Sequence, residues 1–218
     1  MFSHIAPRYE LMNRLMTVGQ DMRWRREVIR RADLPARGRL LDLGAGTGDL
    51  GRLGLHQYPG CHVTAADFTV EMMREGRKNP SSAGLLWSAA DALHLPFADE
   101  TFDAVVSGFL LRNVTDLSRS LSEQKRVLKP GGRIVALDTT RPRSSLLSPF
   151  IRFHLHVVIP TLGGWLARQP AAYRYLPEST EQFLSAEQLA VSMQAAGFRK
   201  IGYHLLMFGT AAIHWGER

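Results

Sequence analysis

Residues 40–49 read Leu-Leu-Asp-Leu-Gly-Ala-Gly-Thr-Gly-Asp, and this stretch decides the fold of the 218-residue chain. A mostly apolar run, typical of a buried strand, leads directly into a glycine-rich turn, and a helix-like stretch follows from Asp49. Glycines let a backbone approach a ligand closely, and the first turn of a helix offers unpaired N–H groups. The stretch therefore predicts a strand, a ligand-binding turn and a helix in succession.

The same alternation of short apolar runs and amphipathic stretches continues along the chain. It predicts strands at Arg39 to Leu43, His62 to Asp67, Leu85 to Ala90, Phe102 to Phe109 and Arg133 to Thr139. It predicts helices at Asp49 to Gln57, Val70 to Lys78 and Leu117 to Leu128, the last closed by the turn Lys129-Pro130-Gly131-Gly132. Such alternation requires crossovers and a mainly parallel sheet covered on both faces. We predict a doubly wound α/β fold.

The two ends of the chain follow a different pattern. Met1 to Ala32 predicts a helical cap, and Ser185 to Ala196 predicts an amphipathic helix. Two strands, Lys200 to Phe208 and Thr210 to Trp215, with Gly209 between them, predict an antiparallel hairpin at the sheet edge. We predict a single domain over 1–218, divided into the cap (1–37), a ligand-binding core (38–140), a lid or substrate insertion (141–184), and the C-terminal helix and hairpin (185–218).

Composition narrows the class of protein. The single cysteine, Cys61, allows no intramolecular disulfide and no cysteine-based zinc site, which favours a reducing, cytoplasmic compartment. His154 and His156 lie two residues apart but lack an evident third ligand, so we predict no metal site. The residues Met1 to Tyr9 contain no apolar signal-peptide core, and prolines, glycines and charges interrupt the apolar stretch Ser144 to Leu166. We expect no membrane-spanning helix.

The chain carries 27 Lys and Arg against 20 Asp and Glu. The basic residues gather between Arg23 and Arg31 without the interleaved aromatics of a single-strand nucleic-acid platform, so we expect no nucleic-acid partner. We interpret these arginines as solvated helix faces or contacts to a membrane surface. The segment Phe150 to Leu166 admits three interpretations: a lid, a patch that dips into a bilayer, or a segment packed in the interior.

Acidic residues indicate which ligand the sheet edge binds. Asp67 ends the second predicted strand, where a carboxylate accepts hydrogen bonds from both ribose hydroxyls of an adenosine, and Asp91 ends the third, near where the adenine amino group would lie. A dinucleotide turn reads G-x-G-x-x-G, but its sixth position here is Asp49, which would repel a pyrophosphate. The pattern favours a cationic ligand without phosphate, such as S-adenosylmethionine.

These residues resemble those of the class I S-adenosylmethionine-dependent methyltransferases, and more narrowly the ubiquinone/menaquinone biosynthesis C-methyltransferase family. The glycine turn and Leu128-Lys129-Pro130-Gly131-Gly132 are shared with the wider superfamily. The more specific resemblance lies in an N-terminal block (Ile5-Ala6-Pro7-Arg8-Tyr9, Asn13-Arg14-Leu15 and Arg23-Trp24-Arg25-Arg26), in Leu111-Arg112-Asn113-Val114, and in Tyr173-Arg174-Tyr175-Leu176-Pro177-Glu178-Ser179. These motifs extend over nearly the whole chain.

The resemblance implies C-methylation of a ring carbon of a demethylated quinol, either demethylmenaquinol or a related benzoquinol. It implies cofactor contacts at Thr47, Asp67, Asp91 and Ala92, and a substrate near Tyr9 and Arg112. The candidate cofactor-binding set also includes Asp42, Gly44, Gly46, Phe68 and Gly108. A quinol with an apolar tail further implies contact with the inner face of a membrane, whereas the oligomeric state, including a homodimer, stays open.

In the implied reaction, the ring carbon attacks the sulfonium methyl group in line, so the protein must chiefly orient the two partners and exclude water. The carbon becomes nucleophilic as the adjacent phenol, with an unperturbed pKa near 10, loses its proton. Arg112 is the candidate cation for the phenolate, Asn113 a hydrogen-bonding partner of a substrate oxygen, and Tyr9 a residue that orders the substrate or a water. The competing interpretation is that Arg112 pairs with a structural carboxylate and Tyr9 only packs.

Three positions depart from the family pattern: Leu110 replaces a usual Gly, Asp138 a usual Glu, and Ser185 a usual Pro. A larger side chain at Leu110 would narrow the substrate pocket. Two other functions therefore stay open at this point: a methyltransferase of the same fold that acts on a soluble small molecule, and a non-catalytic cofactor-binding partner in a quinone-pathway assembly.

Overall fold

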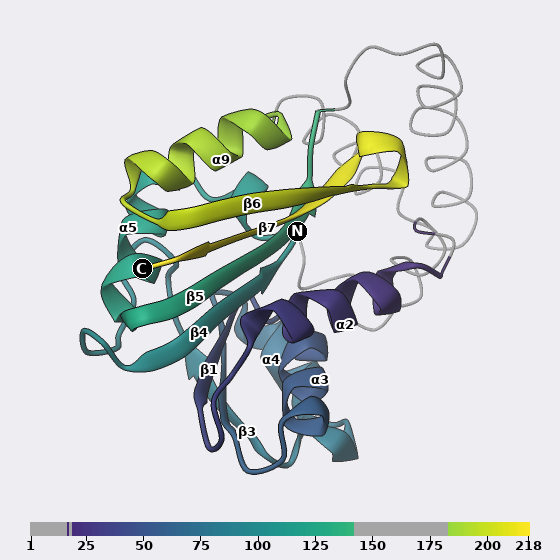
Figure 1. The fold of residues 1–218 in the computed structure, drawn as a ribbon. Helices are drawn as coiled ribbons and strands as arrows, with labels where there is room; N and C mark the ends of the chain where they lie inside the picture. The colour runs from purple at the N-terminus through teal and green to yellow at the C-terminus, as the bar shows by residue number, and fades with distance from the viewer. Residues whose placement is uncertain (1–16, 18, 142–182) are drawn as a thin grey trace.

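The computed structural model describes residue 17 and residues 19–141 and 183–218 of the chain. Its centre is a seven-stranded sheet with the strand order β3-β2-β1-β4-β5-β7-β6 (Figure 1). The strands are β1 (Arg39–Leu43), β2 (His62–Asp67), β3 (Leu85–Ala89), β4 (Phe102–Gly108), β5 (Leu128–Thr139), β6 (Arg199–Leu206) and β7 (Ala211–Glu217). The first five pair in parallel, and β7 runs antiparallel to both β5 and β6.

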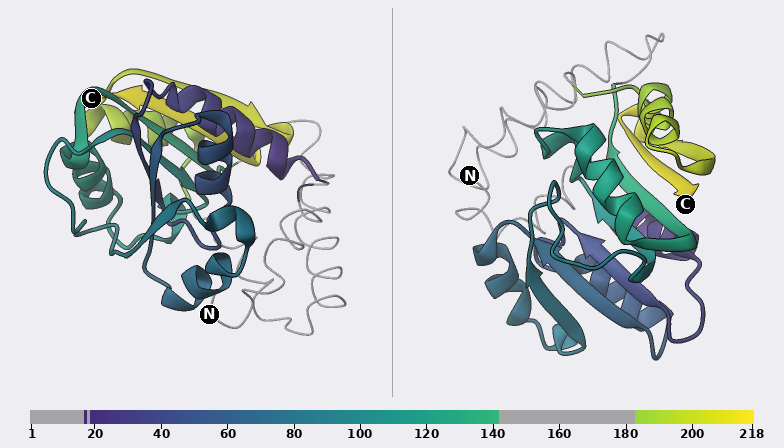
Figure 2. Two further views of the ribbon diagram at one scale, coloured as in Figure 1. Left: turned by 90° about the horizontal axis from the view of Figure 1, so that it is seen from below. Right: turned by 90° about the vertical axis from the view of Figure 1, so that its left-hand side faces the viewer.

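Helices cover both faces of this sheet, as the two turned views show (Figure 2). They are α2 (Asp21–Ala32), α3 (Asp49–Gln57), α4 (Val70–Arg77), α5 (Leu117–Val127) and α9 (Ala186–Ala195), with short 3-10 turns η2 (Pro80–Ser82), η3 (Leu111–Asn113) and η5 (Met207–Gly209). Apolar side chains of α2 and α3 pack on one face, and those of α5 and α9 on the other. The predicted doubly wound α/β fold is confirmed.

The two cores follow from the two-residue period of a strand. Leu40 belongs to the core beneath α2 and α3, whereas its neighbour Leu41 belongs to the core beneath α5, and both are fully buried. Burying one leucine side chain contributes about 1.5–3 kcal/mol. A strand that is apolar on both faces can therefore lie only in the interior of a sheet with helices on each side.

Two local predictions were wrong in detail. The predicted turn at 129–132 belongs to β5, which begins at Leu128 and pairs with Phe102 before the register shifts. Gly131 adopts a left-handed conformation (φ 76°) within this irregularity. Leu128 is fully buried, so its packing places it in the sheet rather than in the helix that ends at Val127.

The predicted C-terminal hairpin is confirmed, but its turn is longer than Gly209 alone. Met207, Phe208 and Gly209 all have positive φ values, of 45°, 56° and 83°. Of the two hairpin strands, only β6 lies at an edge of the sheet, because β7 inserts between β5 and β6. Of the predicted N-terminal cap, α2 is described, and the predicted insertion 141–184 lies almost wholly outside the described residues.

Candidate active site

A cavity of about 370 Å³ opens at the carboxyl ends of β1, β2 and β4, where open α/β sheets bind ligands. Its walls come from the turns that follow these strands, from the stretch after β3, and from η3. The lining includes seven predicted cofactor-binding residues and one predicted catalytic residue: Gly44, Gly46, Asp67, Phe68, Asp91, Ala92, Gly108 and Asn113. The structure thus brings most of the predicted site together.

The glycine turn and Asp67 hold one another in place. Gly44 and Gly46 adopt left-handed conformations, and a Cβ atom at Gly44 would lie 2.9 Å from Cδ1 of Leu110, so a larger residue there would have a strained backbone and would displace the Leu110 side chain. The Gly46 N–H donates to Oδ2 of Asp67 (2.7 Å), and the Thr69 N–H donates to Oδ1 (2.7 Å). Each carboxylate oxygen accepts more than one hydrogen bond, so Asp67 retains acceptor capacity toward the cavity.

The opposite wall of the cavity carries Phe68, Asp91 and Ala92. The Phe68 side chain is 79% exposed although it lines the cavity, an unusual position for a large apolar ring unless a ligand covers it. Asp91 is half-exposed, and its Oδ1 accepts from the Leu93 N–H (2.9 Å). An aromatic face beside a carboxylate provides both stacking and a hydrogen-bond acceptor for a nucleobase.

Behind the glycine turn lies a second, much smaller cavity of about 20 Å³, whose lining includes Asp42, Thr47, Asp49 and Arg25. Asp42 is buried and accepts from the Gly51 N–H through Oδ2 (2.8 Å). Burial raises the pKa of Asp42 to about 7, although this hydrogen bond and the nearby Arg25 charge oppose the shift. Asp42 therefore lies beneath the turn and supports the start of α3 instead of facing the larger cavity.

From the sequence alone, Asp49 is a free negative charge that would repel a pyrophosphate. In the structure, arginines pair with this charge. Asp49 forms ion pairs with Arg52, one turn along α3, and with Arg25 at 3.7 Å. Arg52 also donates to the Thr47 carbonyl (2.6 Å), and Thr47 is buried. Asp49 would therefore repel a dinucleotide less strongly than the sequence indicates, because Arg25 and Arg52 partly neutralise its charge.

Arg25 is the site residue that the sequence analysis missed. It belongs to the arginine cluster interpreted as solvated, yet it is only 6% exposed and lines the small polar cavity. Within the described part of the chain, its partners are carboxylates at 3.8 Å (Asp21) and 3.7 Å (Asp49), and its buried Nε has no hydrogen-bond partner. The signal available in the sequence was the four-residue spacing from Asp21 to Arg25, which places the pair on one helix face.

The buried Nε of Arg25, which makes no hydrogen bond, is one observation on which the fit of S-adenosylmethionine can be judged. Burying a guanidinium without good hydrogen bonds is costly, so a ligand carboxylate beside Arg25 would satisfy it. The cofactor's methionine end carries such a carboxylate, while its ribose and adenine suit Asp67 and the Phe68 and Asp91 wall. The donor set therefore fits the cofactor along its length, from Arg25 to Asp91.

Arg112, the predicted cation, is not among the residues that line the cavity. Its Nη1 donates to Oδ1 of Asp138 (2.9 Å), and the two side chains are 6% and 2% exposed. Its guanidinium also lies 5.0 Å from the Phe109 ring centre. Asn113 does line the cavity and donates to the Phe109 carbonyl (2.8 Å). Tyr9 lies outside the described residues.

In the described part of the chain, no group of three or more His, Cys, Asp and Glu side chains is placed to hold a metal ion. No helix in that part is both long and apolar enough to cross a bilayer.

Comparison with known proteins gives a consistent result. The family model described as the ubiE/COQ5 methyltransferase family matches residues 1–218. A ubiquinone/menaquinone biosynthesis C-methyltransferase from Desulfotalea psychrophila is 50% identical over 100% of this chain and 89% of its own length. A demethylmenaquinone methyltransferase from Thermus thermophilus is 46% identical over 100% of both chains.

Solved structures share the fold at low identity. An S-adenosylmethionine-dependent methyltransferase from Aquifex aeolicus is 17% identical, with a TM-score of 0.62 over 88% of each chain. A phosphoethanolamine N-methyltransferase from Haemonchus contortus, solved with S-adenosylmethionine, is 19% identical, with a TM-score of 0.61 over 84% of this chain and 38% of that one. These similarities concern the fold alone.

Proposed function

This chain belongs to the ubiE/COQ5 methyltransferase family, and from that premise we propose that it methylates a ring carbon of demethylmenaquinol. Its relatives establish S-adenosylmethionine-dependent C-methylation in quinone biosynthesis as its activity. A demethylated benzoquinol is the competing ring system. The observation that carries the proposal is the full-length match to the Thermus demethylmenaquinone methyltransferase, joined to a cavity whose donors suit the cofactor.

S-adenosylmethionine supplies a methyl group that its sulfonium already activates. The residues of this chain then have to orient it, and we assign Asp67 to the ribose hydroxyls, Asp91 with the Ala92 backbone to the adenine edge, and Phe68 to the adenine face. Arg25 binds the methionine carboxylate in a charge-assisted hydrogen bond. Gly44, Gly46 and Gly108 allow the backbone to approach the cofactor closely.

The substrate side of the proposal rests on Asn113, Arg112 and Tyr9. Asn113 lines the cavity, which supports its assignment to a quinol oxygen. Arg112 is the candidate cation for the developing phenolate, and its ion pair with Asp138 means that it must share its charge with that carboxylate. Tyr9 orders the substrate or a water, a role that stays a prediction from the sequence.

A quinol with a long apolar tail resides in a bilayer, so we also propose that this protein is cytoplasmic and associates with the inner face of the membrane. The net charge of +7 supports attraction to anionic lipids.

Leu110 favours a second candidate, methylation of a smaller soluble molecule. Its side chain lines the cavity and contacts Gly44, so it occupies space beside the assigned substrate region. A Leu110→Gly variant should then gain turnover with a bulky naphthoquinol if Leu110 restricts the pocket.

The deciding experiment measures turnover of labelled S-adenosylmethionine with a reduced demethylmenaquinone analogue and, in parallel, with a demethylated benzoquinol, followed by mass analysis. Methyl transfer to a ring carbon of the reduced demethylmenaquinone analogue supports the proposal. Transfer to the benzoquinol alone would show that the substrate ring is a benzoquinol. Tight cofactor binding without methylation of either quinol would direct the search to soluble substrates.

A further inference from the structure

We propose that one face of the molecule docks on an anionic lipid bilayer. We call it the docking face, and it consists of three exposed arginines of α2, Arg23, Arg26 and Arg30, together with Leu205 and Phe208 at the end of the hairpin. The inference rests on the membrane contact proposed above and specifies the surface that makes it.

The arginines form a stripe along α2. Arg23, Arg26 and Arg30 are spaced by three and four residues, so they project from one side of the helix into solvent. Within the described part of the chain, Arg23 and Arg26 have no ion-pair partner, and Glu27 is shared between Arg30 (2.7 Å) and Arg31 (2.6 Å). The stripe therefore keeps an excess of positive charge.

Beside the stripe, apolar side chains protrude from a strained turn. Phe208 is 75% exposed, and Leu205 is 38% exposed. Met207 and Phe208 occupy left-handed conformations, which are energetically unfavourable for residues other than glycine. A turn of this shape favours Gly or Asn, so a protruding Phe conflicts with local preference. Such conflicts concentrate at functional positions.

The arginines share one groove with Leu205 and with Met207, the neighbour of Phe208. A surface groove of about 700 Å³ runs between α2 and the hairpin, and its lining includes Arg23, Arg26 and Arg30 on one side and Leu205 and Met207 on the other. Figure 1 shows the start of α2 and the β6–β7 turn at the same end of the molecule, and Figure 2 agrees. Arginines can therefore meet lipid phosphates while the apolar tip enters the headgroup layer.

The hairpin end of the docking face lies at the carboxyl edge of the sheet. Thr139, at the end of β5, pairs with Ala211 at the start of β7, and the Thr140 N–H donates to the Thr210 carbonyl (3.0 Å). The cofactor cavity opens at this same edge, because β1, β2, β4 and β5 are parallel. A bilayer held against the docking face therefore lies on the side of the molecule where the substrate must enter.

Charge alone would also attract a nucleic acid, but two observations favour lipid. The apolar tip gains nothing from a phosphate backbone, and the exposed large apolar side chains of the face are one aromatic and one aliphatic residue, not a stacking platform. Apolar insertion plus arginine contacts is the combination expected for a peripheral membrane surface.

The experiment is co-sedimentation of the full chain with phosphatidylcholine vesicles, with and without phosphatidylglycerol, at low and high salt. We expect binding only to the vesicles with phosphatidylglycerol, weakened by salt. The triple variant R23Q/R26Q/R30Q should bind on the order of 100-fold more weakly, since each surface arginine contributes about a factor of five. Phe208→Asn should weaken binding about tenfold, and it suits the left-handed turn, so folding is retained.

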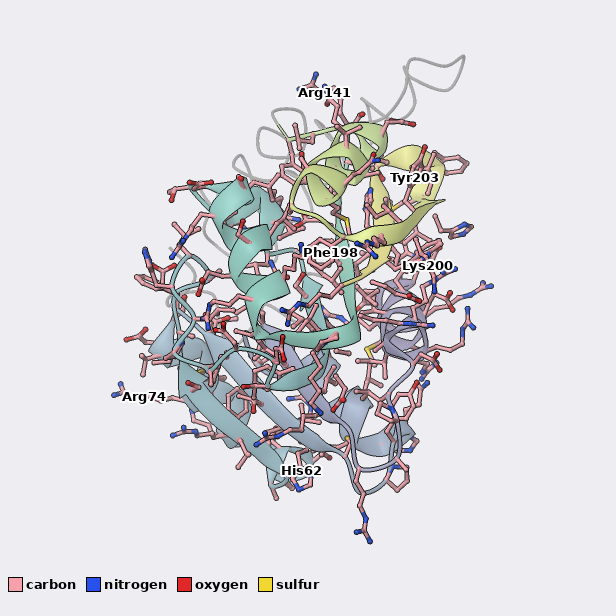
Figure 3. The ribbon with its side chains drawn as sticks, turned by 60° about the vertical axis from the view of Figure 1, so that its left-hand side comes forward. His62, Arg74, Arg141, Phe198, Lys200 and Tyr203 are labelled. Carbon is pink, nitrogen blue, oxygen red and sulfur yellow. The ribbon has the colours of Figure 1, made fainter. Side chains whose placement is uncertain are left out.

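A matched charge control is R37Q/R74Q/R199Q, which removes three exposed arginines outside the docking face. Figure 3 shows Arg74 on the opposite side of the molecule from Lys200 and Tyr203 of β6. The control should bind vesicles nearly as tightly as the unmodified chain. Equal loss in the control and in the α2 variant would overturn the proposal, as would binding of the unmodified chain to RNA but not to anionic vesicles.

Turnover of a short-tailed, water-soluble quinol separates this inference from the proposed function. The α2 and Phe208 variants should turn over such a quinol at the unmodified rate, because they lie outside the cofactor cavity. Vesicle binding without turnover would count against the proposed function alone, and turnover without vesicle binding against the docking face alone.

Discussion

Arg25 shows how one side chain can link the cap to the cofactor cavity. It comes from α2 and reaches the space behind the glycine turn, and its buried Nε, 3.8 Å from a carboxylate oxygen of Asp21, makes no hydrogen bond. Such a donor destabilises the free protein. It favours binding of a ligand carboxylate, because charge-assisted hydrogen bonds are worth about 1.5–3 kcal/mol. The expected consequence is selectivity for ligands that carry the amino-acid group.

We expect Arg25→Met to weaken binding of S-adenosylhomocysteine by about 10- to 100-fold, while binding of methylthioadenosine, which lacks the amino-acid group, changes less than twofold. Isothermal titration calorimetry with both ligands measures the two effects on the same preparation. Arg25→Lys, which keeps the charge, should fall between. Equal losses for both ligands would show that Arg25 only supports the fold.

Arg112 and Asp138 form an ion pair that is almost completely buried. Removing either partner leaves an uncompensated charge and should destabilise the fold by roughly 3–5 kcal/mol. The two substitutions should have different effects on turnover, because only the substitution of Arg112 removes the cation. Arg112→Gln should lower turnover by about 100-fold or more, whereas Asp138→Asn should retain most of it.

Turnover and thermal unfolding of both variants, measured below their melting temperatures, check this expectation. If Arg112 stabilises a phenolate, the pH at which turnover rises should also move upward in Arg112→Gln. A similar fall in turnover for both variants, with no change in the pH profile, would favour the structural interpretation of the ion pair.

Among the elements, α9 begins with a complete capping box. The Ser185 side chain accepts from the Gln188 N–H (3.3 Å), and the Gln188 side chain accepts from the Ser185 N–H (2.9 Å). The departure from the family's usual Pro at this position thus has a structural reason. Ser185→Ala should cost about 1 kcal/mol in the free energy of unfolding.

Ser192→Ala is the matched control, because Ser192 lies inside the same helix and its hydroxyl donates to the Gln188 carbonyl (3.0 Å). Alanine is the better helix former, so this control should be neutral or slightly stabilising. Urea unfolding of the two variants side by side decides whether the capping box contributes as expected.

A second element-scale feature ties α5 to the stretch before β4. Glu123 accepts from the Leu95 N–H (2.8 Å) and pairs with Arg126, which in turn donates to the carbonyls of Leu95 (3.0 Å) and Phe97 (2.8 Å). These hydrogen bonds, that of Arg126 first, lower the pKa of Glu123 to about 2. The carboxylate is thus more stable in the folded than in the unfolded chain.

A lowered pKa contributes stability above the unfolded value of 4.5, and that contribution is lost as the pH falls toward 2. We expect the stability difference between the unmodified chain and Glu123→Gln to reach up to about 3 kcal/mol at neutral pH. It should shrink steadily between about pH 4.5 and pH 2. Denaturant unfolding across this range measures it, and a difference that does not change with pH would contradict the assignment.

For the whole molecule, the sheet order predicts how stability is distributed. β1, β4 and β5 lie in the middle of the sheet and are almost fully buried, whereas β3 and β6 are its edges. Amides of the central strands should exchange with solvent only through global unfolding, and amides of β6 through local opening. Hydrogen exchange with mass spectrometry tests this order.

Adding S-adenosylhomocysteine extends the test to the site. Protection should rise in residues 44–48 and around Asp67, which bind the ligand in our proposal, and not in β6. A uniform rise across the sheet would report global stabilisation alone, and a rise confined to β6 would place the ligand elsewhere.

Local patterns determined the order of strands and helices, the parallel sheet and the acidic residues at its carboxyl edge. The two-residue and 3.6-residue periods of apolar side chains are local properties, and consecutive parallel strands necessarily end at one edge. The motifs around Asp67, Asp91 and Arg112 likewise indicate the family without any tertiary information.

Only the tertiary structure placed β7 between β5 and β6, turned Arg25 inward while Arg23 and Arg26 stayed exposed, and joined Arg112 to Asp138. These arrangements depend on contacts between residues far apart in the chain. The local sequence around an arginine is the same whether the side chain is buried beside a carboxylate or surrounded by water. The physical reason is that burial and ion pairing are properties of packed neighbours, which the local pattern does not contain.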